Sequence, residues 1–349
     1  MAITSLAELG KVLDLTEDEK QWKEDGRNTL PLLISSSMAQ LLGIPGIRRQ
    51  FVPDRRENLD ETGNSDPLEE VRHSRTSRLV HRYRNRAVFL TTDRCFAYCR
   101  HCFRRRFTGT MTGPASDEEI AEAAAYLMEH REIKEVLLTG GDLFTLSDER
   151  LDYMLSVFKE AREDIIYRLC TRAVATEPSR FTDNLFQIIK KHQHGAPFYL
   201  MTHFNHPAEL TTEAVKAVSG FLSLGIPALN QSVLLRGVND DAGTLEELCC
   251  ELLSNRIKPY YLFQGDLVQG TSHLRVDIRK GLEIEKELRL RLSGLAMPQY
   301  TIDLPQGGGK VILTEQHLIK ETEDSYLFTT PEGDMRAYPK NKHPEPDVN

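Results

Sequence analysis

The apolar residues of the chain follow two alternating patterns from residue 87 onward. Short apolar runs cover residues 87–92, 135–139, 165–172, 198–204, 226–235 and 258–267, and runs of this length predict β-strands. The segments between them repeat apolar residues at every third or fourth position, which predicts helices. Six strands that alternate with helices predict a parallel sheet with right-handed crossovers, either doubly wound or a barrel.

Local signals mark the ends of these elements and a different pattern before them. Ser116 and Glu119 have capping-box spacing at the start of a helix, and Gly225 stands where a helix-ending glycine is expected. LAELGKVLDL and TLPLLISSSMAQLLG show helical spacing near the N-terminus, whereas DPLEEVRH (residues 66–73) is polar and reads as a connection. We therefore divide the chain into an N-terminal helical extension (1–80), an α/β core (81–295) and a C-terminal segment (296–349).

Polar side chains stand at or near the ends of the predicted strands. Active sites of parallel α/β barrels form at the carboxyl ends of their strands. One polar residue near each end could be coincidence, but a near-complete series predicts a shared site: Cys95, Asp142, Arg172, His203, Gln231 and Asp266.

Three cysteines follow the first predicted strand with the spacing C-x3-C-x2-C. The thiolates of Cys95, Cys99 and Cys102 could hold three corners of a [4Fe-4S] cluster and leave one iron open, since four cysteines are usual for a closed site. A C-x2-C pair alone could be redox-active or half of a zinc site, but the other three cysteines offer no second pair. A disulfide framework is disfavoured because six cysteines are sparse in 349 residues.

Composition narrows the class of protein. Hydrophobic residues at 40% and charged residues at 28% are ordinary for a soluble globular protein, and a net charge of -8 argues against a general nucleic-acid binder. The arginines beside the cysteines therefore fit a small anionic ligand. No apolar run approaches the ~20 residues that span a membrane, and no secretion signal is evident. Reduced thiols without a targeting segment predict a cytoplasmic protein.

The cysteine spacing after a first strand resembles the radical S-adenosylmethionine (SAM) superfamily. The longer stretch TTDRCFAYCRHCFRRRF is similar to the lysine 2,3-aminomutase family within it, and the resemblance runs from about Asp66 to about Val311. It implies an open six-unit (β/α) partial TIM-type barrel, with an N-terminal helical extension and a short C-terminal β-containing segment. DPLEE resembles the family segment that precedes the barrel.

The resemblance also implies three cofactors and the residues that meet them. A [4Fe-4S] cluster would bind Cys95, Cys99 and Cys102, and SAM would bind its open iron. The family residues that meet SAM or the phosphate and carboxylate groups of the cofactors match Arg82, Arg86, Gly140, Gly141, Asp142, His203 and Gln231. Without the resemblance, Arg82 and Arg86 would be interpreted as solvent-exposed surface residues. The glycine turn departs from the family's GGDPL by reading GGDLF.

Lys310 follows a run of three glycines. A phosphate-loop reading fails because Leu304 and Val311 stand where that motif needs glycine and serine or threonine. A lysine on a glycine turn can instead form a Schiff base with pyridoxal 5′-phosphate (PLP), although GGGK alone is usually a surface turn. The resemblance implies the PLP role, with Gln306 replacing a further family glycine.

The family resemblance implies an L-lysine 2,3-aminomutase. Such an enzyme interconverts L-α-lysine and L-β-lysine by a radical 1,2-amino migration started by a 5′-deoxyadenosyl radical. Arg104 matches the arginine that pairs with the substrate carboxylate, and Asp266 and Asp303 match an acidic pair that grips the distal ammonium. Asp303 could instead be a turn residue before Pro305.

Several alternatives stay open on the sequence. They are a β-lysine-forming enzyme that serves elongation factor P modification, an aminomutase for another amino acid, a radical SAM enzyme without PLP, and a non-enzymatic iron-sulfur or nucleic-acid-binding protein. Zinc is not expected, because no cysteine follows Cys250 and Asp241 replaces one zinc ligand of the longer relatives. The expected partners are a reductant such as flavodoxin or ferredoxin and, as an option, further copies of the chain.

Overall fold

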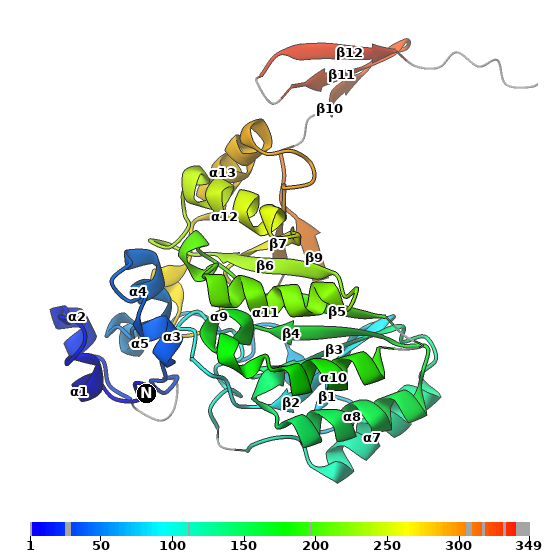
Figure 1. The fold of residues 1–349 in the computed structure, drawn as a ribbon. Helices are drawn as coiled ribbons and strands as arrows, with labels where there is room; N and C mark the ends of the chain where they lie inside the picture. Colours follow the sequence, from blue (N-terminus) through cyan, green and yellow to red (C-terminus); the bar gives the residue numbers. More distant parts are fainter. Residues whose placement is uncertain are drawn as a thin grey trace, which may run out of the picture.

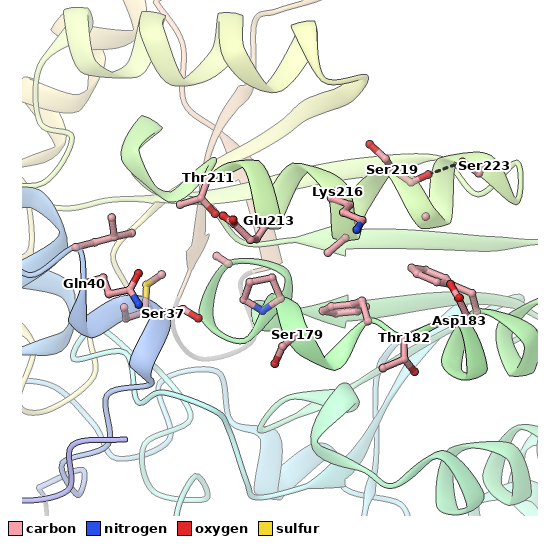
Figure 2. A pocket seen from close by; sticks show the side chains of 18 residues that line it. Ser37, Gln40, Ser179, Thr182, Asp183, Thr211, Glu213, Lys216, Ser219 and Ser223 are labelled. Carbon is pink, nitrogen blue, oxygen red and sulfur yellow. Dashed lines mark hydrogen bonds between the residues drawn. The ribbon is translucent and has the colours of Figure 1, made fainter. Parts of the chain in front are cut away.

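The computed structural model describes residues 2–24, 29–110, 112–193, 195, 197–304, 309–315, 318–330 and 333–339. Within these residues, nine strands form one sheet in sequence order, from β1 to β9 (Figure 1). Strands β2 to β8 are parallel to their neighbours, and the edge strands β1 and β9 are antiparallel. The strands are β1 (Leu79–Tyr83), β2 (Arg86–Thr92), β3 (Glu135–Gly140), β4 (Ile166–Thr171), β5 (Phe198–Thr202), β6 (Ala228–Leu234), β7 (Ile257–Gln264), β8 (Gln299–Leu304) and β9 (Gly309–Ile312).

Helices connect the parallel strands and cover one face of the sheet (Figure 1). They are α7 (Asp117–Glu129), α8 (Asp148–Ala161), α9 (Ala173–Thr176), α10 (Asp183–His192), α11 (Thr212–Ser223), α12 (Ala242–Ser254) and α13 (Ile278–Arg291). The capping box of Ser116 and Glu119 opens α7, and Gly225, with φ 77°, follows the end of α11. Every helix among the described residues is too short or too polar to span a bilayer.

The six predicted strands are confirmed, and the sheet is the open α/β arrangement of a partial barrel. β1 and β9 stand at the two ends of the strand order, so the sheet does not close on itself within the described residues. The C-terminal segment is β-containing as expected, and it supplies β8, a parallel strand that the apolar runs did not predict. A separate three-stranded antiparallel sheet follows, formed by β10 (Leu318–Glu321), β11 (Ser325–Thr329) and β12 (Met335–Pro339).

Along each strand, successive side chains alternate between the hydrophobic core and the opposite face of the sheet. In β3, Val136 and Leu138 are fully buried in the layer between sheet and helices, while Leu137 and Thr139 line a cavity on the other face. β4 repeats the pattern, with Leu169 in the core and Cys170 at the cavity. Successive side chains of a strand point to opposite faces of the sheet. The residues between the core positions therefore all face the cavity side.

The N-terminal extension is helical but less regular than its sequence pattern predicts. Its helices are short: α1 (Leu6–Leu9), α2 (Glu17–Lys20), α3 (Ser36–Ala39), α4 (Pro45–Phe51), α5 (Arg56–Leu59) and α6 (Glu70–His73). TLPLLISSSMAQLLG forms only one α-helical turn, because Ile34 bridges to Ile3 as extended chain and Ser35 caps a new helix. These elements share a second apolar cluster, against which Ala97 and Cys99 pack.

A buried ion-pair network joins this extension to residues 93–109, here called the cysteine loop. Glu57 of α5 accepts hydrogen bonds from Arg100 (Nε 2.8 Å, Nη2 2.6 Å) and from Arg105 (Nη2 2.6 Å), and all three side chains are at most 4% exposed. Burial opposes ionisation, but the two arginines lower the pKa of Glu57. Arg100 also donates to the carbonyls of Leu30 and Pro31. The position of the cysteine loop therefore depends on the N-terminal layer.

We expect Glu57→Gln to lower the free energy of unfolding by about 3–5 kcal/mol, since it leaves two buried guanidinium groups without a negative partner. Denaturant unfolding followed by circular dichroism measures this. Glu17→Gln is the matched control, because its partner Lys20 lies on the surface and the change should cost less than about 1 kcal/mol. Equal effects of the two substitutions would show that the network does not support the loop.

Candidate functional site

A cavity of about 410 Å³ lies against the face of the sheet that the helices do not cover. Residues from β1 to β9, the cysteine loop and α6 line it. It brings together all of the site residues expected from the sequence, namely Arg82, Arg86, Cys95, Cys99, Cys102, Arg104, Gly140, Gly141, Asp142, His203, Gln231, Asp266, Asp303 and Lys310.

The three cysteines line this cavity. All are free thiols, and the Cys102 N–H donates to the Cys99 carbonyl at 2.9 Å. Burial raises the pKa of the Cys95 thiol well above its usual value, with further contributions from Asp142 and the other two cysteines. Burial likewise raises the pKa of Cys99 against the opposing charge of Arg172. Desolvated thiols close enough to influence one another would gain from a shared cationic group.

The three cysteines have the chemistry of iron-sulfur ligands. Iron-sulfur clusters are held by cysteine thiolates, each bound to a different iron. Three cysteines on one short loop suit that chemistry.

The glycine turn after β3 packs directly on the cysteine loop. The Gly141 N–H donates to the Thr92 carbonyl at 2.6 Å, and the Asp142 N–H donates to the Arg94 carbonyl at 2.7 Å. A Cβ at Gly141 would lie 2.1 Å from the Arg94 oxygen, so only glycine fits. The Asp142 carboxylate accepts from the backbone N–H groups of Phe144, Arg172 and Ala173 and from the Thr171 hydroxyl. These hydrogen bonds hold the Asp142 carboxylate against the C-terminal end of β4.

Arg172 connects the cysteines to a buried polar network. Its Nη1 donates to Cys99 Sγ at 2.8 Å, and its Nη2 donates to Glu209 at 2.8 Å and to Gln50 at 2.5 Å. Gln50 belongs to α4, so the N-terminal extension reaches this network as well.

His203 stacks on His101, with 3.1 Å between their Nε2 atoms and 5.4 Å between ring centroids. Burial lowers the pKa of both imidazoles well below the usual value, with a contribution from the charge of Arg172. Two neutral rings therefore lie between the cysteine loop and β5, in a cavity whose wall also includes Gln231 of β6.

Lys310 lines the same cavity. β8 and β9 pair so that Asp303 and Lys310 are direct cross-strand partners, and Lys310 Nζ donates to Asp303 Oδ2 at 2.5 Å. The ammonium also lies 4.2 Å from the ring centroid of Phe263, within cation–π range. Gly307 and Gly308 of the glycine run lie outside the described residues.

The charges around Lys310 perturb one another. Burial lowers the pKa of Lys310, although Asp303 and Asp266 oppose this shift. Burial and the charge of Asp303 raise the pKa of Asp266 to about 7, against the opposing charges of Lys310 and Arg104. Two carboxylates that share one buried space thus need a cation between them.

Arg82 and Arg86 add positive charge to the cavity beside Tyr83. The Arg86 guanidinium lies 3.8 Å from the ring centroid of Tyr83, whose hydroxyl donates to Asp303 at 3.3 Å. Arg82 Nη2 is buried and has no hydrogen-bond partner within the part of the chain that the structure describes. An unsatisfied buried guanidinium nitrogen suits an anionic ligand.

Comparisons with known proteins identify the family of the chain. The family model for lysine-2,3-aminomutase matches residues 284–348. The L-lysine 2,3-aminomutase of Bacillus subtilis is 36% identical over 343 residues, which cover 97% of this chain and 72% of that protein. The chain belongs to the lysine 2,3-aminomutase family.

Family members with different named substrates are equally similar to the chain. The L-lysine 2,3-aminomutase of Clostridium subterminale is 36% identical (96% of this chain, 81% of that one), and the glutamate 2,3-aminomutase of Clostridioides difficile is 37% identical (95% and 79%). Among solved structures, a radical SAM methyltransferase from Sphaerobacter thermophilus is 16% identical to this chain, with a TM-score of 0.45. The match covers 64% of this chain and 68% of that chain. As an aminomutase family member the chain is an isomerase, and overall identity does not select its amino acid substrate.

The structure adds residues that motif reading did not assign in this aminomutase. Glu70 lies in the cavity, although DPLEEVRH was expected to be only a connection. His101, Tyr83 and Phe263 also line it without a motif to mark them. Outside the cavity, His206 Nδ1 accepts a hydrogen bond from the Ala208 N–H at 3.2 Å, and the Asp241 side chain caps α12.

We expect Gly141→Ala to destabilise the fold and displace the cysteine loop, because the new methyl group overlaps a backbone carbonyl. Overpacking of this kind costs about 1–3 kcal/mol or more. Thermal unfolding measures the loss, and Gly43→Ala is the control because a Cβ there meets nothing within 4 Å. A Gly141→Ala protein as stable as the control would contradict the close packing of turn and loop.

Proposed function

We propose that the chain is an L-lysine 2,3-aminomutase that interconverts L-α-lysine and L-β-lysine with a [4Fe-4S] cluster, SAM and PLP. The observation that carries this proposal is the pairing of Lys310 with Asp303 in the same cavity as the three cysteines. Family membership supports the class of reaction. The charged residues around Lys310 support lysine as the substrate.

The cavity contains two groups of residues with different chemistry. Cys95, Cys99 and Cys102 would hold the cluster, and Lys310 would hold PLP, with Arg82 and Arg86 near its phosphate. When bound, SAM supplies a carbon radical that removes a substrate hydrogen, and PLP supplies a conjugated ring that stabilises the migrating radical. The chain's own residues orient these groups and exclude water.

The acidic pair supports lysine over glutamate as the substrate. Asp303 already accepts a hydrogen bond from a primary ammonium, that of Lys310, and Asp266 lies close enough to influence both groups. The distal ammonium of a bound lysine has the same chemistry and would take that position. A glutamate side chain would place a third carboxylate beside these two, which is unfavourable in a buried space.

Lys310→Ala should abolish β-lysine formation, because no other group would hold PLP beside the substrate. The assay is anaerobic turnover of L-lysine by the reconstituted enzyme, with the product measured by mass spectrometry. Lys216→Ala, on the exposed face of α11, is the control and should keep full activity. Unchanged turnover by Lys310→Ala would rule out the PLP-dependent reaction.

Asp303→Asn should lower kcat/KM for lysine by roughly 30- to 1000-fold, since truncating one partner of a buried charge pair costs about 2–4 kcal/mol. Asp183→Asn, a similar change on the exposed first turn of α10, should have no effect. Wild-type enzyme that turns over glutamate faster than lysine would contradict the substrate assignment.

The KM for lysine should fall by up to about tenfold between pH 6 and pH 8. Asp266, with a pKa near 7, is mostly protonated at pH 6 and must ionise to bind the ammonium, which stays charged throughout. The Asp266→Asn enzyme should bind lysine more weakly and lose this pH dependence. A pH profile that keeps the same step in Asp266→Asn would assign the step to another group.

A further inference from the structure

The segment just before the sheet enters the cavity. Leu68 and Glu70 line it, and Glu70, the first residue of α6, is buried at 6% exposure. Glu70 therefore belongs to the N-terminal extension in sequence and to the active site in space.

Glu70 binds one edge of the Arg104 guanidinium. Arg104 Nε donates to Glu70 Oε1 at 2.8 Å and to Oε2 at 3.1 Å, and Arg104 Nη2 forms an ion pair with Oε1 at 2.8 Å. Arg104 Nη1 donates to the Thr139 hydroxyl at 3.3 Å. A guanidinium can bind carboxylates along two edges, Nε with Nη2 and Nη1 with Nη2. Glu70 uses the first edge, so the remaining donors point along the second.

The backbone around Glu70 is built to hold it there. Glu69 has a φ of 53°, a left-handed conformation that is unfavourable for a residue with a side chain. The Asp66 carboxylate accepts from the Glu70 N–H at 3.0 Å and from the Val71 N–H at 2.9 Å, and Arg106 pairs with Asp66 at 3.3 Å. A strained residue fixed by several polar contacts beside a cavity indicates a required position.

The ion pair with Glu70 limits rotation of the Arg104 side chain, which is 13% exposed and lines the cavity. The guanidinium edge that Glu70 does not use therefore stays available to a carboxylate in the cavity.

We propose that Glu70 is a positioning residue that orients Arg104, so that its second edge binds the carboxylate of the amino acid substrate. This inference rests on the proposed function and names the residue that sets carboxylate recognition. It predicts that Glu70 substitutions weaken substrate binding through Arg104. The contacts to the side chain of the substrate lysine should not change.

The test compares wild type, Glu70→Gln, Glu70→Asp and the control Glu69→Gln as reconstituted holoenzymes. Glu69 is a suitable control because its carboxylate pairs with the exposed Arg72 and does not line the cavity. KM and kcat are measured for L-lysine and for its carboxamide, in which the carboxylate is neutral. Glu70→Gln should raise the KM for lysine at least tenfold, reduce the preference for lysine over the carboxamide, and change kcat less than KM.

A second measurement separates positioning from a loss of stability. In an Arg104→Lys background, Glu70→Gln should cause little further loss in lysine binding, because the group through which it acts is already gone. Glu70→Asp keeps the charge with a shorter reach and should fall between wild type and Glu70→Gln. If Glu70→Gln only lowers the melting temperature and keeps the wild-type preference between the two substrates, the inference is wrong.

The outcomes also separate this inference from the proposed function. Wild-type enzyme that fails to convert lysine overturns both. Wild-type enzyme that converts lysine, with Glu70→Gln kinetics equal to those of Glu69→Gln, overturns the role of Glu70 alone.

Discussion

The structure depends on the buried ion pairs that Glu57 makes with Arg100 and Arg105. These contacts attach the cysteine loop to the short helices of the N-terminal extension, and Arg100 lies directly between Cys99 and His101 in sequence. A three-cysteine loop has little core of its own, so its shape must come from what surrounds it. The extension supplies that surrounding layer through Glu57, Gln50 and the apolar cluster that contacts Cys99.

The cavity follows from this anchoring and from strand alternation. The cysteine loop and the glycine turn after β3 place the cysteines at this cavity, and the β8–β9 pairing places Lys310 there. Arginines, carboxylates and histidines all line the same space. Relatives of equal similarity are named for lysine and for glutamate, whose side chains carry opposite charges.

Sequence reasoning predicted the strands and the candidate residues that lie at or near strand ends, because a short apolar run and a cysteine spacing are local signals. It expected longer N-terminal helices, because apolar spacing there reflected packing on the cysteine loop. It could not find Glu70, whose position depends on the left-handed backbone of Glu69 and on Arg104, 34 residues away. It also could not show that Asp303 faces Lys310, which required the antiparallel register of β8 and β9.

The most direct test of this account is a substrate competition under anaerobic conditions. The enzyme is reconstituted with iron, sulfide and PLP, then given SAM, a reductant and equal concentrations of L-lysine and L-glutamate. We expect β-lysine that depends on both SAM and PLP, with little β-glutamate. Formation of β-glutamate in preference to β-lysine would contradict the assignment of Asp266 and Asp303 to the substrate ammonium.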